Sequence, residues 1–258
     1  MTFMPDFKYL FVGGCARSGT TALTHLANAH DDVAIGIERY NSAWGNKRLT
    51  PDLFEEKRFF EVRDTDTRAP DAVRKRLEEF KENHGADKYA MARVRGDKNP
   101  MITRHYDMLR ENFQSFKIAF IVRNPFSVAL SFQKRFENKN DTFRSDGFQA
   151  INDWNSSIRT TLAAIKDGMP IFVVLYDRVL GSLENALAWF DALGLDPDKA
   201  DLERVRYHVN YKKSMESKTA QIHESMMDAI SQRCQFGVYR ALAHEHCVLR
   251  HAGSQAAP

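Results

Sequence analysis

Residues 9–21 constrain the fold more than any other part of the chain. Residues 9–12 form a short apolar run closed by Gly13 and Gly14, as expected of a buried strand that ends in a turn. Residues 20–27 then repeat their apolar positions at helical spacing. A strand, a loop and a helix are therefore contiguous. In this arrangement backbone N–H groups and the helix dipole converge on a phosphate.

The loop reads Gly14-Cys15-Ala16-Arg17-Ser18-Gly19-Thr20-Thr21. Its spacing matches the phosphate-binding form G-x-x-x-x-G-K-[ST], except that Thr20 replaces the lysine. A nucleoside triphosphatase uses that lysine on the terminal phosphates, whereas here the cation is Arg17, inside the loop. A glycine turn with a solvated arginine is the alternative for an isolated match, but the flanking strand and helix favour an anion held without a metal. The residues expected to bind it are Arg17, Ser18, Gly19, Thr20 and Thr21.

A second anion-binding element is predicted around Arg123. Residues 117–122 form an apolar strand, and a helix is expected to begin at Pro125. Arg123 at the end of this strand can donate two parallel, charge-assisted hydrogen bonds to a phosphate. Ser131, two turns into the helix, can reach the same group. Either residue alone is commonly structural, but together with the first loop they indicate a second anion site.

The remaining apolar runs define the fold class. Residues 33–37 and 171–175 are typical of buried strands, and residues 183–193 have helical spacing before a glycine. Continuous apolar strands that alternate with helices predict an α/β fold, with a mostly parallel central sheet and helices on both faces. We expect a single domain over residues 1–258, with a variable polar insertion at about residues 39–95.

Composition argues against several other classes of protein. With 37 basic and 34 acidic residues the net charge is only +3, so no overall field favours nucleic acid. The three cysteines lack disulfide or metal spacing, and His244 and His246 do not share a helix face, so no metal is expected. Residues 1–8 lack the apolar run of a signal peptide, and no stretch is apolar enough to span a membrane. These features predict a cytoplasmic protein without an integral membrane segment.

At the two anion-binding elements the chain resembles the sulfotransferases that use 3′-phosphoadenosine 5′-phosphosulfate (PAPS), especially the bacterial and tyrosylprotein types. Arg17-Ser18-Gly19-Thr20-Thr21 is similar to their phosphosulfate loop, and Arg123 to Ser131 is similar to their 3′-phosphate element. Gly96-Asp97-Lys98-Asn99-Pro100 and Leu175-Tyr176-Asp177 add weaker similarity, so the resemblance spans residues 10–195. It implies the P-loop-like sulfotransferase fold, PAPS as donor and adenosine 3′,5′-bisphosphate as product.

The resemblance also implies how the donor is held. Arg17 and the amides of its loop would bind the 5′ side, while Arg123 and Ser131 would bind the 3′ phosphate. Lys98 would place its ammonium beside the sulfuryl group, because family members often have a lysine in this segment. The alternative is a surface lysine in a turn before Pro100.

A basic, polar stretch at residues 210–218 lies where the family usually has a flexible loop that closes over the cofactor. The resemblance therefore implies donor contacts from this stretch, with Lys213 and Ser214 preferred. A solvated surface segment is the alternative, as for most charge runs.

Glu38 is the predicted general base. It follows the strand at residues 33–37, and the carboxyl ends of strands in such sheets face the ligand crevice. In tyrosylprotein sulfotransferases and several bacterial relatives a glutamate stands at the similar place, after a helix, a turn and a strand. The resemblance thus implies that Glu38 takes the proton of the acceptor. The alternative is a structural glutamate paired with Arg39 or another surface base.

No pattern in the sequence identifies the acceptor or the oligomeric state. A hydroxyl or an amine on a small molecule, a carbohydrate or a peptide fits the chemistry, and we expect residues 39–95 and 136–148 to form its pocket. Two other functions remain open. A P-loop nucleotide kinase or NTPase would need a lysine at Thr20, and a non-catalytic nucleotide-binding scaffold would not need both Glu38 and Lys98.

Overall fold

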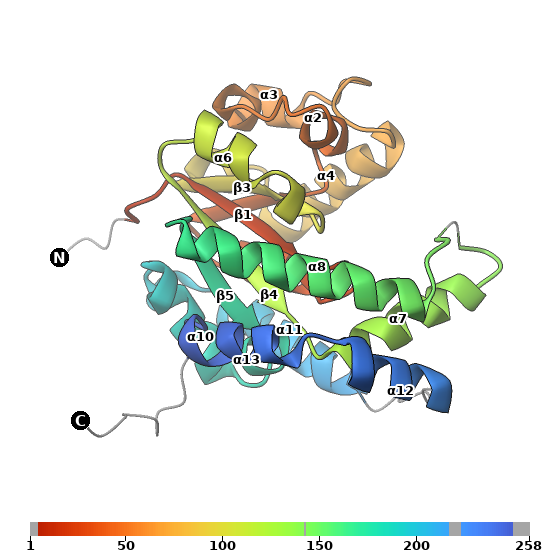
Figure 1. Cartoon of the computed structure of the whole chain (residues 1–258). Coiled ribbons are helices and arrows are strands. Elements are labelled where there is room, and N and C mark those ends of the chain that lie inside the picture. The colour runs from red at the N-terminus through yellow and green to blue at the C-terminus, as the bar shows by residue number, and fades with distance from the viewer. Residues whose placement is uncertain (1–4, 142, 217–222, 250–258) are drawn as a thin grey trace, which may run out of the picture.

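The core of the protein is a five-stranded parallel sheet in the order β2-β3-β1-β4-β5 (Figure 1). The computed structural model describes residues 5–141, 143–216 and 223–249, with the backbone alone for residues 212–216. The strands are β1 Tyr9–Gly14, β2 Val33–Ile37, β3 Val94–Lys98, β4 Phe116–Val122 and β5 Ile171–Leu175. All paired strands run parallel.

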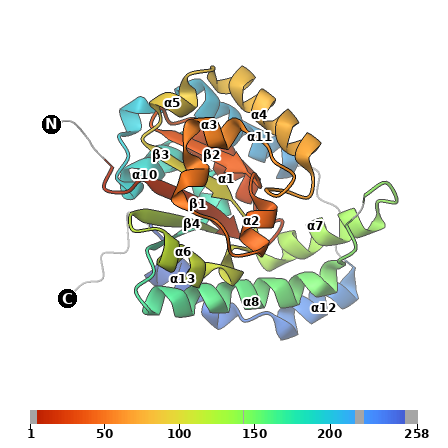
Figure 2. The same cartoon turned by 90° about the horizontal axis from the view of Figure 1, so that it is seen from above.

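Helices cover both faces of this sheet, which confirms the predicted α/β class. Figure 2 shows α1 and α11 on one side and α8 and α13 on the other. These four helices are α1 Thr20–Asn28, α8 Gly147–Lys166, α11 Leu202–Glu216 and α13 Phe236–Glu245. The other helices outside the segment at 39–95 are α6 Tyr106–Asn112, α7 Pro125–Glu137, α9 Tyr176–Val179, α10 Leu183–Leu193 and α12 Glu224–Arg233, with 3-10 turns η2 Ile102–Arg104 and η3 Pro197–Lys199.

The carboxyl ends of the strands meet at one edge of the sheet because every strand runs in the same direction. In the register of the sheet Ile37 lies opposite Lys98, and Val12 lies opposite Lys98 on the other side. The loop after β1, Glu38 after β2 and Arg123 after β4 therefore lie along the same edge. This is the edge where open α/β sheets bind their ligands.

Strand β3 was not predicted: no strand was assigned to residues 94–98, and a turn before Pro100 was only the alternative for Lys98. The strand contains Arg95, Asp97 and Lys98, and these charges break the apolar pattern that marks the other strands. Gly96 allows the close approach to β1: a Cβ there would lie 1.8 Å from the carbonyl oxygen of Leu10. Lys98 is only 2% exposed, so the alternative of a surface lysine is wrong.

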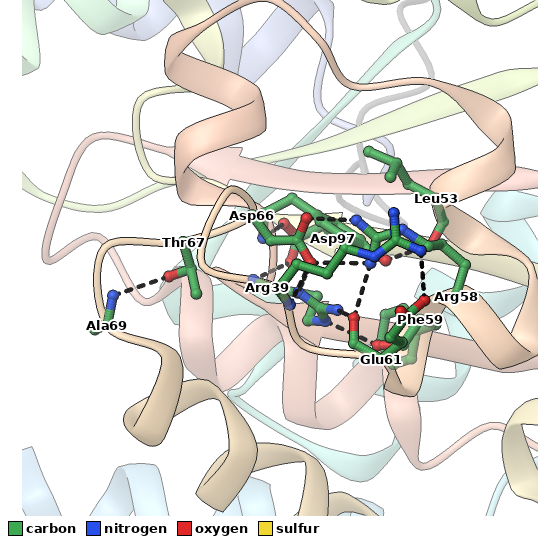
Figure 3. Close-up of polar contacts among 11 residues, drawn as sticks. Arg39, Leu53, Arg58, Phe59, Glu61, Asp66, Thr67, Ala69 and Asp97 are labelled. Carbon is green, nitrogen blue, oxygen red and sulfur yellow. Dashed lines mark hydrogen bonds and ion pairs between the residues drawn. The ribbon is translucent and has the colours of Figure 1, made fainter.

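The polar segment at about 39–95 folds mainly into helices, and Figure 1 shows α2, α3 and α4 above β3 and β1. A buried arginine, Arg39, joins its parts (Figure 3). Its guanidinium donates from Nε to the Phe59 carbonyl at 2.8 Å, from Nη1 to Asp66 Oδ2 at 3.0 Å and from Nη2 to the Glu61 carbonyl at 2.7 Å. Arg58 also pairs with Asp66. The elements are α2 Asn41–Gly45, η1 Pro51–Phe54, α3 Glu56–Phe60, α4 Pro70–His84 and α5 Lys88–Met91.

The C-terminal part differs from the prediction at one place. The stretch at 210–218 was expected to be a loop, but α11 continues through Glu216, so the expectation is wrong up to that residue. Residues 217 and 218 lie outside the part that the structure describes. None of the helices in the described ranges is long and apolar enough to cross a membrane.

Candidate active site

The loop between β1 and α1 has the backbone of an anion-binding turn. Gly19 immediately precedes α1 with a φ of 97°, a left-handed conformation that favours glycine. A Cβ at this position would lie 2.3 Å from the ring of Tyr176, so a larger residue would displace that ring. The hydroxyl of Ser18 is buried and has no hydrogen-bond partner among the described residues. Since buried hydroxyls normally form hydrogen bonds, the Ser18 hydroxyl is suited to donate one to an oxygen of a ligand.

Arg17 connects the two anion-binding elements that the sequence predicts. Its Nε donates to Ser131 Oγ on α7 at 3.0 Å, although the two residues lie far apart in the chain. Burial lowers the pKa of Arg17, with the nearby cations Arg135 and Arg123 acting in the same direction and Asp141 acting against them. A guanidinium remains charged under such a shift, because its ordinary pKa is above 12. The first loop and the second element therefore form one cationic site.

Arg123 follows β4 and faces the same loop. Its guanidinium carbon lies 4.3 Å from the centre of the Tyr176 ring, and its Nε is buried without a hydrogen-bond partner among the described residues. The indole of Trp154 donates to the carbonyl of Arg123 at 2.9 Å and fixes the backbone there. Tyr176 thus contacts both Gly19 and Arg123 and helps to position them. The sequence did not indicate this role beyond the weak similarity of Leu175-Tyr176-Asp177 to the family.

Glu38 and Lys98 form an ion pair at the carboxyl ends of β2 and β3. Lys98 Nζ lies 2.5 Å from Glu38 Oε1, and the N–H of Glu38 donates to the carbonyl of Lys98 at 3.1 Å. The lysine side chain is 3% exposed, whereas that of the glutamate is 29% exposed. Glu38 has a φ of 53°, which is unusual for a residue other than glycine. Arg39 pairs with Asp66 instead. The alternative in which Arg39 is the partner of Glu38 is therefore wrong.

The ion pair sets the protonation of both groups. Burial raises the pKa of Glu38, but the charge and hydrogen bond of Lys98, together with Arg76 and Asn41, outweigh burial, so the pKa lies below the ordinary value of a glutamate. Burial lowers the pKa of Lys98, and Glu38 offsets only part of this shift. Glu38 is therefore ionised at neutral pH and able to accept a proton.

A fully buried carboxylate, Asp97, fixes the turn that carries Glu38. It accepts hydrogen bonds from the N–H groups of Arg39 at 3.0 Å and Tyr40 at 3.1 Å, and from the indole of Trp44 at 3.0 Å. These bonds hold the chain just after the left-handed residue. Asp97 thereby determines where the carboxylate of Glu38 points.

A cavity of about 460 Å³ opens beside the ion pair. Glu38, Lys98 and Arg17 line one end, and α1 and α4 form the walls. The prediction that the segment at 39–95 contributes a pocket agrees with the position of α4. No described residue of 136–148 lines the cavity; instead Asp141 holds Arg135, which does, through two hydrogen bonds of 2.6 Å.

Lys213 and Ser214 lie near the end of α11, where the structure does not describe their side chains. The course of the helix is clear. The N–H of Asp201, just before α11, donates to the carbonyl of Ala29 at 2.8 Å, and the His208 ring stacks on His25 with centroids 5.6 Å apart. Helix α11 therefore runs back along α1 toward the phosphate loop.

The parallel sheet, the turn into α1 and the cationic edge define a P-loop-like α/β protein. The sulfotransferase family model matches residues 10–196, more than half of the chain. The protein belongs to the sulfotransferase family.

Solved structures of this family share the fold. A sulfotransferase from Alicyclobacillus acidocaldarius has 14% identity and a TM-score of 0.53, covering 93% of this chain and 95% of that one. The sulfotransferase domain from the curacin biosynthetic pathway has 18% identity and a TM-score of 0.51, covering 90% and 98%. No curated protein sequence matches the chain.

Proposed function

We propose that the protein transfers a sulfuryl group from PAPS to a hydroxyl or amine of an acceptor. The observation that carries the proposal is the Glu38–Lys98 ion pair, which lines one cavity together with Arg17 of the phosphate loop. A base, a buried cation and an anion-binding loop thus lie within one site. This is the set of groups that sulfuryl transfer requires.

The donor would lie across the two joined elements. Arg17, Ser18, Gly19, Thr20 and Thr21 would hold its 5′ side, and the unpaired hydroxyl of Ser18 and the amides at the start of α1 support this assignment. Arg123 and Ser131 would hold the 3′ phosphate. Lys213 and Ser214 are proposed as further contacts, supported only by the course of α11.

The chemical step needs one proton transfer and one bond exchange. The acceptor oxygen or nitrogen attacks sulfur, the bond from sulfur to the bridging phosphate oxygen breaks, and adenosine 3′,5′-bisphosphate leaves. Glu38 takes the acceptor proton, and Lys98 and Arg17 stabilise the charge that develops on the departing phosphate. Lys98 must then share its charge between Glu38 and the leaving group, which its position next to the phosphate loop allows.

The first test is nucleotide binding. Adenosine 3′,5′-bisphosphate is expected to raise the melting temperature without added metal, because the joined anion site exists only in the folded chain. Differential scanning fluorimetry measures the shift, with ATP and magnesium as the comparison that separates a kinase or NTPase. A flat response to saturating bisphosphate, or stabilisation by ATP and magnesium alone, would contradict the assignment.

The second test removes the Arg123 guanidinium, which is proposed to bind the 3′ phosphate. Arg123→Ala is expected to weaken binding of the bisphosphate by about 1.5–3 kcal/mol, the scale of a hydrogen bond to a charged group. Arg123→Lys should retain only part of the affinity, since an ammonium lacks the planar fork and the stacking on Tyr176. Isothermal titration calorimetry measures both variants. Unchanged affinity in the alanine variant would assign the 3′ phosphate to other residues.

The proposal covers residues 1–258 as one catalytic domain in the cytoplasm. The three cysteines are free and buried, which suits a reducing compartment. Burial raises the pKa of Cys15, so its thiol is inert in the phosphate loop and serves as a small residue in a tight turn.

A further inference from the structure

The cavity beside Glu38 is bounded on one side by a single face of α4. The residues that line it recur at helical spacing from Val73 to His84, which at the rise of a helix corresponds to roughly 16 Å. Val73, Leu77 and Phe80 give this face an apolar part, and its polar part consists of Arg76, Glu79, Asn83 and His84. The cavity therefore accommodates an elongated, partly apolar molecule with a charged contact near one end.

Arg76 and Arg17 are the cations of this cavity that form no ion pair with a described residue, although the charge of Arg76 also helps to lower the pKa of Glu38. Lys98 pairs with Glu38, Arg135 with Asp141, and Arg39 with Asp66. Arg17 belongs to the proposed donor site and donates to Ser131. The Nη1 of Arg76 donates to the carbonyl of Ile37 at 3.0 Å, and no ion pair joins it to a described residue. Its remaining N–H groups are available to a ligand.

Away from Glu38 the cavity is lined by His25, His84 and one acid, Glu79, which lies close enough to His25 to act on its pKa. Arg204 on α11 donates from Nη1 to His84 Nδ1 at 3.1 Å. Burial and the neighbouring Arg204 lower the pKa of His84 to about 4, so this ring is neutral and its electrostatic surroundings are positive. The side chain of Glu79 is half exposed and lies 3.9 Å from Lys75. The lining holds five arginine and lysine side chains against two acids, Glu38 and Glu79, so the cavity as a whole favours an anion.

We propose that the acceptor carries an acidic group, a carboxylate or a phosphate, and that Arg76 binds this group while the reacting hydroxyl or amine lies against Glu38. The inference rests on the proposed sulfuryl transfer. Arg76 is anchored to Ile37, the residue next to Glu38, and consecutive Cα atoms are about 3.8 Å apart. The acid and the reacting group are therefore only a few bonds apart in the acceptor, and its apolar part lies along α4.

The test compares two variants of the same helix. Arg76→Gln removes the charge and keeps much of the side-chain length. Arg74→Gln is the matched control, because Arg74 is half exposed and pairs with Asp71 at 2.7 Å outside the cavity. The probes are two series, one phenolic and one aliphatic, in which a single hydroxyl compound carries a carboxylate, a phosphate, a neutral amide or an ammonium group. Calorimetry on the bisphosphate-bound protein measures their affinities.

The acidic members are expected to bind about 10- to 100-fold more tightly than the amide in the wild type and in Arg74→Gln. Arg76→Gln should abolish this preference while leaving the affinity for adenosine 3′,5′-bisphosphate unchanged. Comparing the carboxylate with the phosphate identifies which acid fits. Equal binding of the amide, a preference for the ammonium compound, or no binding of any acid would overturn the proposal. Loss of bisphosphate affinity in Arg76→Gln would overturn it as well, because Arg76 would then serve the donor. Failure of the proposed function itself is distinct, since the wild type would then bind no bisphosphate.

Discussion

Replacing Glu38 with glutamine is expected to lower turnover by about 10²–10⁴ while leaving the fold and nucleotide binding in place. Glutamine keeps the shape of the side chain and can still accept a hydrogen bond from Lys98, but it cannot take a proton. The ion pair with Lys98 holds Glu38 ionised and in a fixed place, which is what a general base requires. Turnover with saturating PAPS and acceptor measures the loss, and a melting curve with adenosine 3′,5′-bisphosphate checks that the site remains intact.

Near-normal turnover in the glutamine variant would remove the role of Glu38 and direct attention to a histidine. His25 is the one to examine, since it lines the same cavity. His30 is fully buried and bonds to the carbonyl of Asp196 at 2.8 Å. His105 packs against Trp44 with ring centroids 5.5 Å apart and does not line the cavity. A His25→Gln variant would then be expected to show the loss that Glu38→Gln did not.

Lys98→Met is expected to lower turnover by about 10²–10³, the usual cost of removing one group that stabilises developing charge. It should also move the pH dependence of kcat/KM. Lys98 contributes most to lowering the pKa of Glu38, with Arg76 and Asn41 acting in the same direction, so its loss lets burial move that pKa upward. Because the base acts only when ionised, activity is lost as pH falls through its pKa. The acidic limb should therefore lie at higher pH in the variant than in the wild type.

Lys117→Met is the matched control for this change. Lys117 is also a largely buried lysine on the sheet and pairs with Asp6 at 2.6 Å, but it does not line the cavity. We expect turnover within a few-fold of the wild type and an unchanged acidic limb. If Lys98→Met lowered turnover without moving that limb, Lys98 would act on the leaving group alone, and the assignment of Glu38 as the titrating base would be contradicted.

The sequence predicts the strands and helices whose buried side chains are apolar. The predicted ranges of β2 and β5 and the predicted helix at 183–193 agree with the structure residue for residue, because hydrophobic runs mark them directly. Strand β3 is different, since Asp97 and Lys98 are buried only because other residues bond to them. Hydrophobic periodicity cannot reveal a strand whose charges are satisfied by partners far along the chain.

The site residues likewise differ in whether a local pattern or a distant partner reveals them. Arg17 and Ser131 could be named from local motifs, and the structure brings them together. The pairing of Glu38 with Lys98 depends on the order β2-β3 in the sheet, which no local pattern encodes. The end of α11 was predicted to be a loop because the resembling family usually has a flexible loop there, yet lysine and glutamate are good helix formers and extend the helix to Glu216.

The three bonds to Asp97 have a consequence for protein engineering. Two of them come from main-chain N–H groups, those of Arg39 and Tyr40, and every residue except proline supplies such a group. At these two bonds Asp97 recognises the path of the chain, and at the third it recognises the indole of Trp44. A foreign segment could be grafted after Glu38 without rebuilding the turn that carries it, provided that its backbone follows the same course, proline is kept out of positions 39 and 40, and the indole is kept at position 44. The turn that carries Glu38 could thus be kept while the segment after it is varied to select new acceptor preferences.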